Sequence, residues 1–280
     1  MNSLENLDLF HLMLFALVLA LTGCLSGFLA GLLGVGGGII VVPMLYLLFP
    51  ALGVAEEIRM HLAVGTSLAT VIPNAVTSAR SHYAKGSLDF ELLRKLGPPI
   101  IVGVIGGSIF GGRSSGQTLI VIFATLALLV AFYMAFRRDN WVIRRDLTRS
   151  FLLRTPIGLF IGWFSVLMGI GGGTLSVPTM NLFNIEMRRA VGTGAAIGSL
   201  IGIPGLLGFI VTGWGNPLLP PFSLGYCSLI GVAMIIPSSM LMVRKGVLVA
   251  HSIDQSLLRK IFACFLLTTS AKMFLSAFGS

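Results

Sequence analysis

Two glycine-rich runs are the residues of this chain best suited to chemistry, because they can bind a ligand through the backbone. The run GVGGGIIVVP at 34–43 recurs as GIGGGTLSVP at 169–178, and every glycine and the proline lie 135 positions further on (34 to 169, 43 to 178). Glycine adopts positive φ without penalty, so a triplet lets the chain reverse and leaves successive backbone N–H groups unscreened. The proline suits the first turn of a helix that follows the triplet, and the N-terminal end of such a helix attracts anions. The candidate anion-binding glycines are Gly36, Gly37, Gly38, Gly171, Gly172 and Gly173.

Two other interpretations of the glycine runs assign them different roles. Small residues also let transmembrane helices pack closely, and this structural role remains the alternative. The residues at 34–36 resemble a dinucleotide-binding loop, with Glu56 and Glu57 downstream, but that motif requires a strand–helix–strand context. Because the flanking segments are apolar and of membrane length, we expect no cofactor.

Uncharged polar side chains supply further hydrogen-bond donors. The stretch AVGTS at 63–67 recurs as AVGTG at 190–194, and each shared residue lies 127 positions further on (63 to 190). Hydroxyl and amide groups suit the oxygens of a sulfonate or a carboxylate, although a Ser or Thr in a membrane helix can equally bond to a backbone carbonyl. We add these residues to the predicted site, the last one as a source of positive charge: Thr66, Ser67, Asn74, Thr174, Thr193 and Arg80.

The ionisable residues favour an anion over a cation. All ten acidic residues lie at segment ends or in loops, so no carboxylate lies deep in an apolar segment to bind a cation or relay protons. Near the segment ends, His61 is a candidate for titration, whereas Lys272 can extend its amine to the membrane surface. Cys24, Cys227 and Cys264 are scattered through apolar stretches, as expected of buried thiols, so we predict no metal site and no disulfide.

The composition indicates that membrane segments position these residues. Of 280 residues, 55% are hydrophobic and only 10% are charged, and the mean hydropathy is +0.96. Charged residues make up roughly a quarter of an ordinary soluble domain. The net charge of +9 comes mainly from short loops between apolar segments, as expected for cytoplasmic loops. We therefore predict a membrane protein with no nucleic-acid partner.

Apolar segments recur from one end of the chain to the other. The segments at 39–50 and 174–185 are too short to span a bilayer of about 30 Å alone. Each is predicted to be the return arm of a hairpin whose tip is a glycine triplet. The predicted segments are 8–33, 39–50, 59–83, 96–112, 118–136, 153–170, 174–185, 189–213, 222–243 and 257–278.

Loop charges predict how these segments are oriented. The linker 137–152 is rich in arginine and is therefore predicted to be cytoplasmic, with both chain termini outside. Each half then holds one hairpin and three crossings, so the halves have opposite orientations, as in many transporters. The predicted fold is an all-α polytopic membrane protein of two inverted-topology repeats. The first repeat is 1–136 (hairpin 8–50, helices 59–83, 96–112 and 118–136), and the second is 153–280 (hairpin 153–185, helices 189–213, 222–243 and 257–278).

The paired G-x-GGG-x-x-x-x-P runs, the paired A-V-G-T stretches, the basic linker and the length together resemble one family of membrane permeases. This is the TauE/SafE family, also called the sulfite exporter or toluene-sulfonate uptake permease family. The resemblance covers essentially the whole chain. It implies export or uptake of small sulfur-containing anions, such as sulfite, sulfoacetate, other organosulfonates or thiosulfate.

We therefore expect a secondary transporter, an exporter of such an anion, embedded in the lipid bilayer of a bacterial inner membrane. A passive anion channel, or an uptake permease for a related anion, is the alternative. An intramembrane hydrolase with Ser67 or Ser199 as nucleophile would need a base at membrane depth, so we predict that the chain is not an enzyme. The identity of the anion, the coupling ion, the direction of transport and the formation of a homodimer stay open.

Overall fold

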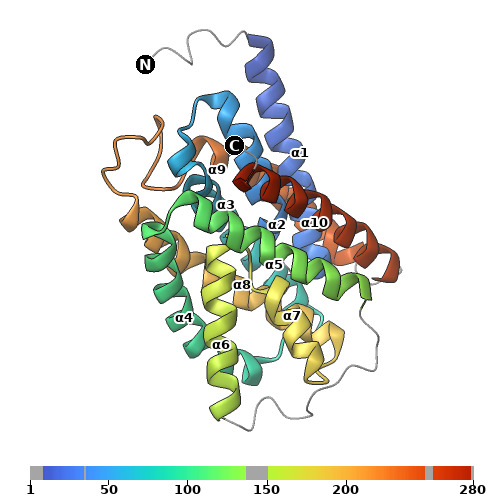
Figure 1. Ribbon diagram of the computed structural model, residues 1–280. Coiled ribbons are helices and arrows are strands. Elements are labelled where there is room, and N and C mark those ends of the chain that lie inside the picture. Colours follow the sequence, from blue (N-terminus) through green and yellow to red (C-terminus); the bar gives the residue numbers. More distant parts are fainter. Residues whose placement is uncertain (1–8, 35, 137–150, 250–254, 279–280) are drawn as a thin grey trace.

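The protein is a bundle of α-helices in its computed structural model, which describes residues 9–34, 36–136, 151–249 and 255–278 (Figure 1). Within these ranges the only β-contact is an isolated bridge between Ser223 and Ser228. The helices are α1 (Leu9–Leu33), α2 (Gly38–Leu48), the short 3-10 helix η1 (Phe49–Leu52), α3 (Glu56–Ala84), α4 (Phe90–Arg113), α5 (Gly116–Phe136), α6 (Phe151–Leu167), α7 (Gly173–Leu182), α8 (Met187–Thr212), α9 (Leu229–Val249) and α10 (Gln255–Phe278).

Six helices of the described part are long and apolar enough to cross a membrane, namely α1, α3, α4, α5, α8 and α9. Helix α1 shows how such a helix meets lipid, since Leu14, Leu17, Leu21 and Leu25 recur at helical spacing and are all exposed. Apolar side chains exposed in this pattern suit a hydrocarbon environment. The two helices that follow the glycine runs, α2 and α7, are much shorter, as the hairpin prediction requires.

The helices pack in matched pairs drawn from the two halves of the chain. Helix α1 packs against α9, and α6 packs against α4, so each pair joins one half to the other. Helices α3 and α8 pack on each other between these pairs, and α5 lies beside α10 (Figure 1). The polar residues of α3 and α8 are consequently held in the protein interior rather than in lipid.

Glycines allow the cross-half pairs to approach closely. A Cβ atom added at Gly27 of α1 would lie 2.0 Å from the carbonyl oxygen of Ser239 on α9. One added at Gly162 of α6 would lie 2.1 Å from the carbonyl oxygen of Ile100 on α4. Close packing between helices, the alternative role given above for the glycine runs, is thus seen at glycines outside those runs.

The structure differs from the predicted segments most clearly at α9. The prediction was a helix over 222–243, whereas α9 runs from Leu229 to Val249. Phe222 and Gly225 have φ values of 59° and 53°, which interrupt a helix, and the Ser228 side chain caps the first turn of α9. Apolar composition alone does not distinguish a buried loop from a buried helix.

Part of the predicted organisation concerns residues outside the described ranges. Of the predicted linker 137–152, only 151 and 152 are described, as the first residues of α6. The ends of the chain at 1–8 and 279–280 also lie outside the described residues. The position of the linker and of both termini therefore stays a prediction.

Candidate functional site

The two glycine runs meet in the interior of the protein. A Cβ atom added at Gly36 would lie 2.8 Å from the Cα atom of Gly171, and one added at Gly38 would lie 2.2 Å from the carbonyl oxygen of Gly169. The described residues of both runs are buried as far as the first turns of α2 and α7. The structure thus brings the two predicted triplets into direct contact, at a spacing that only glycine permits.

Each run leads into a helix whose first turn lacks a side-chain cap. Gly37 precedes α2 with a φ of 79°, and Gly172 precedes α7. Neither glycine has a side chain that could accept a hydrogen bond from the first turn. Because the first backbone N–H groups of a helix have no partner within that helix, two buried helix starts present donors beside the loop contact.

Ser67 of α3 ties the two glycine loops together. Its hydroxyl donates to the carbonyl oxygen of Gly169 over 2.7 Å and lies 3.5 Å from the carbonyl oxygen of Gly38. The side chain is fully buried. Ser67 is thus placed as predicted, at the junction of both runs, although its proton is already used in a bond within the protein.

Replacing Ser67 by alanine should lower the free energy of unfolding by about 1–3 kcal/mol, because the buried carbonyl of Gly169 would lose its donor. Ser199→Ala is the matched control, since the Ser199 hydroxyl donates only within its own helix, to Ala196. Thermal unfolding of the purified protein measures both variants. Equal unfolding temperatures for the two would contradict the bridging role.

Several buried polar atoms near the loops have no hydrogen-bond partner among the described residues. They are Ser26 Oγ, Asn74 Nδ2 and Thr174 Oγ1. Asn74 uses its Oδ1 atom to accept from the Ser239 hydroxyl over 2.9 Å, which leaves the amide donor free. Buried donors rarely stay unsatisfied, because each costs about 1–3 kcal/mol. Unpartnered donors beside the glycine loops are what a binding site for a hydrogen-bond acceptor requires.

Ser26 is a further candidate residue that no sequence pattern indicated. A Cβ atom added at Gly37 would lie 2.2 Å from the Ser26 hydroxyl oxygen, so α1 holds this hydroxyl directly against the first glycine loop. In sequence Ser26 is an isolated serine in an apolar helix, and the position 135 residues further on is Ile161. The repeat therefore carried no signal for it.

The paired threonines dock two chain segments rather than facing an empty space. The Thr66 hydroxyl oxygen accepts from the backbone N–H of Ser228 over 2.9 Å. The Thr193 hydroxyl oxygen accepts from the backbone N–H of Asp89 over 3.1 Å. Each donor is the residue just before a helix of the opposite half, so the two contacts are reciprocal.

The glycine that precedes each threonine completes the same contact. A Cβ atom at Gly65 would lie 1.9 Å from the carbonyl oxygen of Tyr226, and one at Gly192 would lie 2.5 Å from that of Ser87. In each pair the glycine leaves room for a backbone carbonyl of the docked segment. The threonine then accepts from the backbone N–H that lies two residues later in that segment. We refer to these contacts as the 226–228 dock on α3 and the 87–89 dock on α8.

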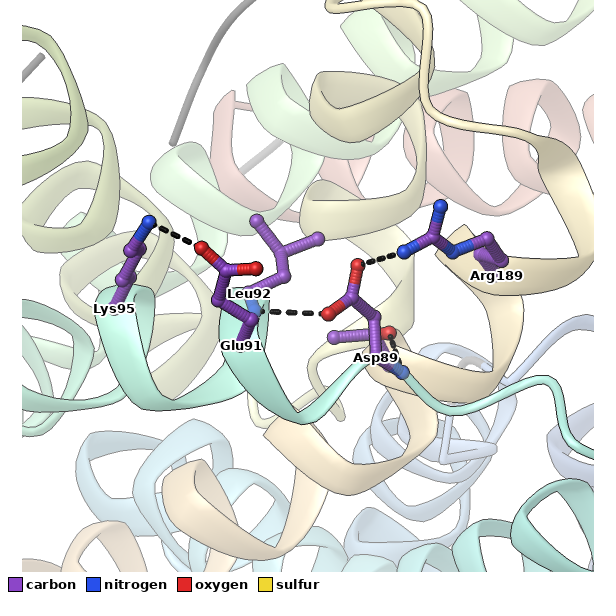
Figure 2. Close-up of polar contacts among 6 residues, drawn as sticks. Asp89, Glu91, Leu92, Lys95 and Arg189 are labelled. Atoms are coloured by element: carbon purple, nitrogen blue, oxygen red, sulfur yellow. Dashed lines mark hydrogen bonds and ion pairs between the residues drawn. The ribbon is translucent and has the colours of Figure 1, made fainter. Parts of the chain in front are cut away.

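An ion pair reinforces only the 87–89 dock. Figure 2 shows the Asp89 carboxylate between the backbone N–H of Leu92, at 3.1 Å, and the Arg189 guanidinium, at 2.5 Å. The neighbouring pair Glu91–Lys95 is exposed and contributes little. At the 226–228 dock the corresponding residue, Ser228, is uncharged. The two docks thus share a backbone geometry but differ in electrostatics.

Arg80 is not brought to the glycine loops by any contact of the described residues. Its side chain is exposed near the end of α3. A guanidinium at the end of a membrane helix commonly reaches toward water. A role for Arg80 in binding the anion therefore stays a prediction, without support from its position.

A polar cavity lies at the end of α3 that carries Glu56 and Glu57. It has a volume of about 570 Å³ and lies between α3, the turn from α4 to α5 and the loop before α9. Its lining includes the exposed Arg113 and the buried His61. The Tyr226 ring lies 4.8 Å from the His61 ring, and its backbone packs on α3 at Gly65. Tyr226 thus belongs both to the lining of this cavity and to the 226–228 dock.

The six helices of membrane length support a multi-pass membrane protein. Comparison with known proteins then identifies the class as membrane transporters. The family model described as "Sulfite exporter TauE/SafE" matches residues 19–273. The chain therefore belongs to the TauE/SafE family.

Individual relatives agree with this assignment. A probable membrane transporter protein of Haemophilus influenzae is 38% identical over 262 residues, which cover 93% of this chain and 98% of the relative. One of Methanocaldococcus jannaschii is 27% identical over 232 residues, which cover 81% and 84%. No solved structure matches the chain. The family and these relatives are described as membrane transporters, not as enzymes.

Proposed function

We propose that this TauE/SafE protein is a secondary transporter that exports a small sulfur-containing anion, such as sulfite, sulfoacetate or another organosulfonate, across a bacterial inner membrane. The observation that carries the proposal is the contact between two buried glycine loops, each leading into an uncapped helix start. The description of the family as a sulfite exporter supports the substrate class.

The chemistry around the loops supports an anion as the ligand. Helix starts and unpartnered Asn, Ser and Thr donors offer hydrogen bonds and partial positive charge. No acidic side chain of the described residues is buried, so a cation would find no carboxylate partner there. A tetrahedral or pyramidal oxyanion, which accepts several hydrogen bonds at once, fits this set of donors.

The reciprocal packing supports two inverted repeats. The pair α1–α9 corresponds to the pair α6–α4, and the 226–228 dock corresponds to the 87–89 dock, when the halves are exchanged. In the topology proposed from the loop charges, the 87–89 dock faces the cytoplasm and the 226–228 dock faces outward. Inverted repeats with a site at their broken helices suit alternating access.

The docks offer a simple account of alternating access. With both docks closed the glycine loops are buried, which corresponds to an occluded state. Release of the 226–228 dock would open the loops outward, and release of the 87–89 dock would open them to the cytoplasm. Rocking of one repeat against the other while one dock is released would carry the anion across.

The proposed function is tested by counterflow in proteoliposomes. Radiolabelled sulfite or sulfoacetate should enter saturably, and unlabelled anion inside the vesicles should accelerate its entry. A passive channel would give neither saturation nor acceleration. Absence of flux for sulfite, sulfoacetate, taurine, thiosulfate and sulfate alike would overturn the proposed substrate class.

Cys227 reports on the 226–228 dock. Burial raises the pKa of its thiol to about 11, so at pH 8 the thiolate fraction is far below that of a free cysteine. We expect maleimide to label Cys227 about 100-fold more slowly than a free thiol, with the rate increasing as the pH approaches 11. Mass spectrometry of a Cys24→Ala/Cys264→Ala protein measures the rate. Labelling at the rate of a free thiol would contradict a closed dock.

A further inference from the structure

We propose that the polar cavity beside His61 is a second binding site for the transported anion, and that protonation of His61 controls its affinity. The inference rests on the proposed function, because it takes the same class of ligand. It concerns a different place, since no described residue of either glycine run lines this cavity.

The geometry leaves one nitrogen of His61 available for a proton. The Nε2 atom lies 2.9 Å from the carbonyl oxygen of Ser114, and because a carbonyl can only accept, Nε2 carries the hydrogen. In the neutral ring Nδ1 then holds a lone pair, and it has no partner among the described residues. The side chain is only 3% exposed. The His61 imidazole, in the lining of the cavity, therefore has one hydrogen-bonded nitrogen and one unpartnered nitrogen that can accept a proton.

The charges around the cavity determine what a proton on His61 would do. The ionisable side chains that line it with His61 are Glu56, Glu57, Arg113 and Tyr226. Two carboxylates and one guanidinium give a net charge of −1 while the imidazole and the phenol are neutral. Two cations lie on elements that line the cavity without lining it themselves. Arg59 lies over the Tyr46 ring and donates to the carbonyl oxygen of Val54, and the exposed Lys272 lies one turn before Ser276 on α10.

Protonation of His61 would bring the net charge of the cavity lining to zero and add a second cation to a lining that already includes Arg113. No hydrogen bond or ion pair joins Arg113 to another described residue, so its guanidinium is available to the anion. A unit charge at about 6 Å is worth about 1–3 kcal/mol at effective dielectric constants between those of water and a protein surface.

The cavity is large enough for a small organic anion, and its lining includes neutral polar groups that could bind one. Its volume of about 570 Å³ exceeds what one or two waters need, and its neutral polar lining includes Gln117 and Asn216. The Asn216 amide donates to the Tyr226 hydroxyl over 3.1 Å, which orients both groups. The proton that charges Nδ1 comes from the solution facing the cavity and returns to it, so no bond of the anion is broken.

The test uses sulfoacetate, whose charge stays constant between about pH 6 and pH 8, so that any pH effect belongs to the protein. Binding to the purified full-length protein is measured by isothermal titration calorimetry at both pH values. We expect the wild type to bind about tenfold more tightly at the lower pH, and His61→Gln to lose this dependence. Glutamine preserves a donor for the carbonyl of Ser114 but takes up no proton.

Two control variants separate the site from a general effect of pH. His82→Gln alters the other buried histidine of α3 and should preserve the pH dependence. Arg113→Gln should weaken binding at both pH values and leave the response to pH in place. A wild-type affinity independent of pH, or a His61→Gln protein with an unchanged response, would overturn the inference while the proposed function stands. Absence of sulfoacetate binding to the wild type would overturn the inference, and it would overturn the proposed function as well if counterflow also showed no flux for any of the five anions.

Discussion

Replacement of Gly37 by valine is expected to abolish anion transport while leaving the protein in the membrane. Gly37 has a φ of 79°, which a β-branched residue rarely adopts, and an added Cβ would lie 2.2 Å from the Ser26 hydroxyl oxygen. Gly172→Val should have the same effect for a different reason, because its Cβ would lie 2.5 Å from the Ile197 side chain. Either change would displace a loop that the anion is proposed to contact.

Gly86→Val is the matched control for backbone strain. Gly86 also has a positive φ, of 68°, but an added Cβ would meet nothing within 4 Å. The control protein should therefore show some loss of stability and still transport the anion. Counterflow at equal amounts of membrane protein measures all three variants. Full transport by both Gly37→Val and Gly172→Val would show that the loops are not the site.

Removing the hydrogen-bond acceptor of one dock should favour the outward-open state, and removing that of the other dock should favour the cytoplasm-open state. Thr66→Val leaves the backbone N–H of Ser228 without its partner, which favours release of the 226–228 dock. Thr193→Val does the same to the N–H of Asp89 and favours release of the 87–89 dock. The loss of one buried hydrogen bond is worth about 1–3 kcal/mol, enough to shift a two-state population about tenfold.

Labelling of Cys227 distinguishes the two threonine variants. Thr66→Val should accelerate modification of Cys227 by maleimide about tenfold, because release of the dock exposes the thiol and returns its pKa toward the ordinary value. Thr193→Val should leave that rate unchanged or lower it. Equal acceleration by both variants would mean that the threonines only stabilise the fold and do not act as alternating docks.

The residues that recur were the part of the site that could be predicted from the sequence. The repeat marked the two backbone breaks, and the structure brings the glycine triplets together. Ser67 also lies there, although it does not recur and was included only as a polar residue next to a recurring stretch. The roles of Thr66 and Thr193 were not predictable, since each hydroxyl binds a segment of the opposite half. A pattern within one half does not indicate which segment of the other half will pack against it.

Other features depended on tertiary contacts that leave no pattern in the sequence. Ser26 joins the first glycine loop only because α1 packs beside it, and it has no counterpart in the repeat. The start of α9 was predicted too early, because an apolar loop at 222–228 has the composition of a helix. Arg80 was included for its charge, yet the structure leaves it exposed. Charge and composition predict the environment of a residue better than they predict its neighbours.

The most direct test of the central claim is anion binding to the purified protein, compared between the wild type and Gly172→Val. The glycine-loop site predicts that the wild type binds at least one of sulfite, sulfoacetate, taurine, thiosulfate and sulfate saturably. Gly172→Val, folded and in the same detergent, should lose the tightest of these interactions. Binding of equal affinity in both proteins would contradict a site at the junction of the two glycine loops.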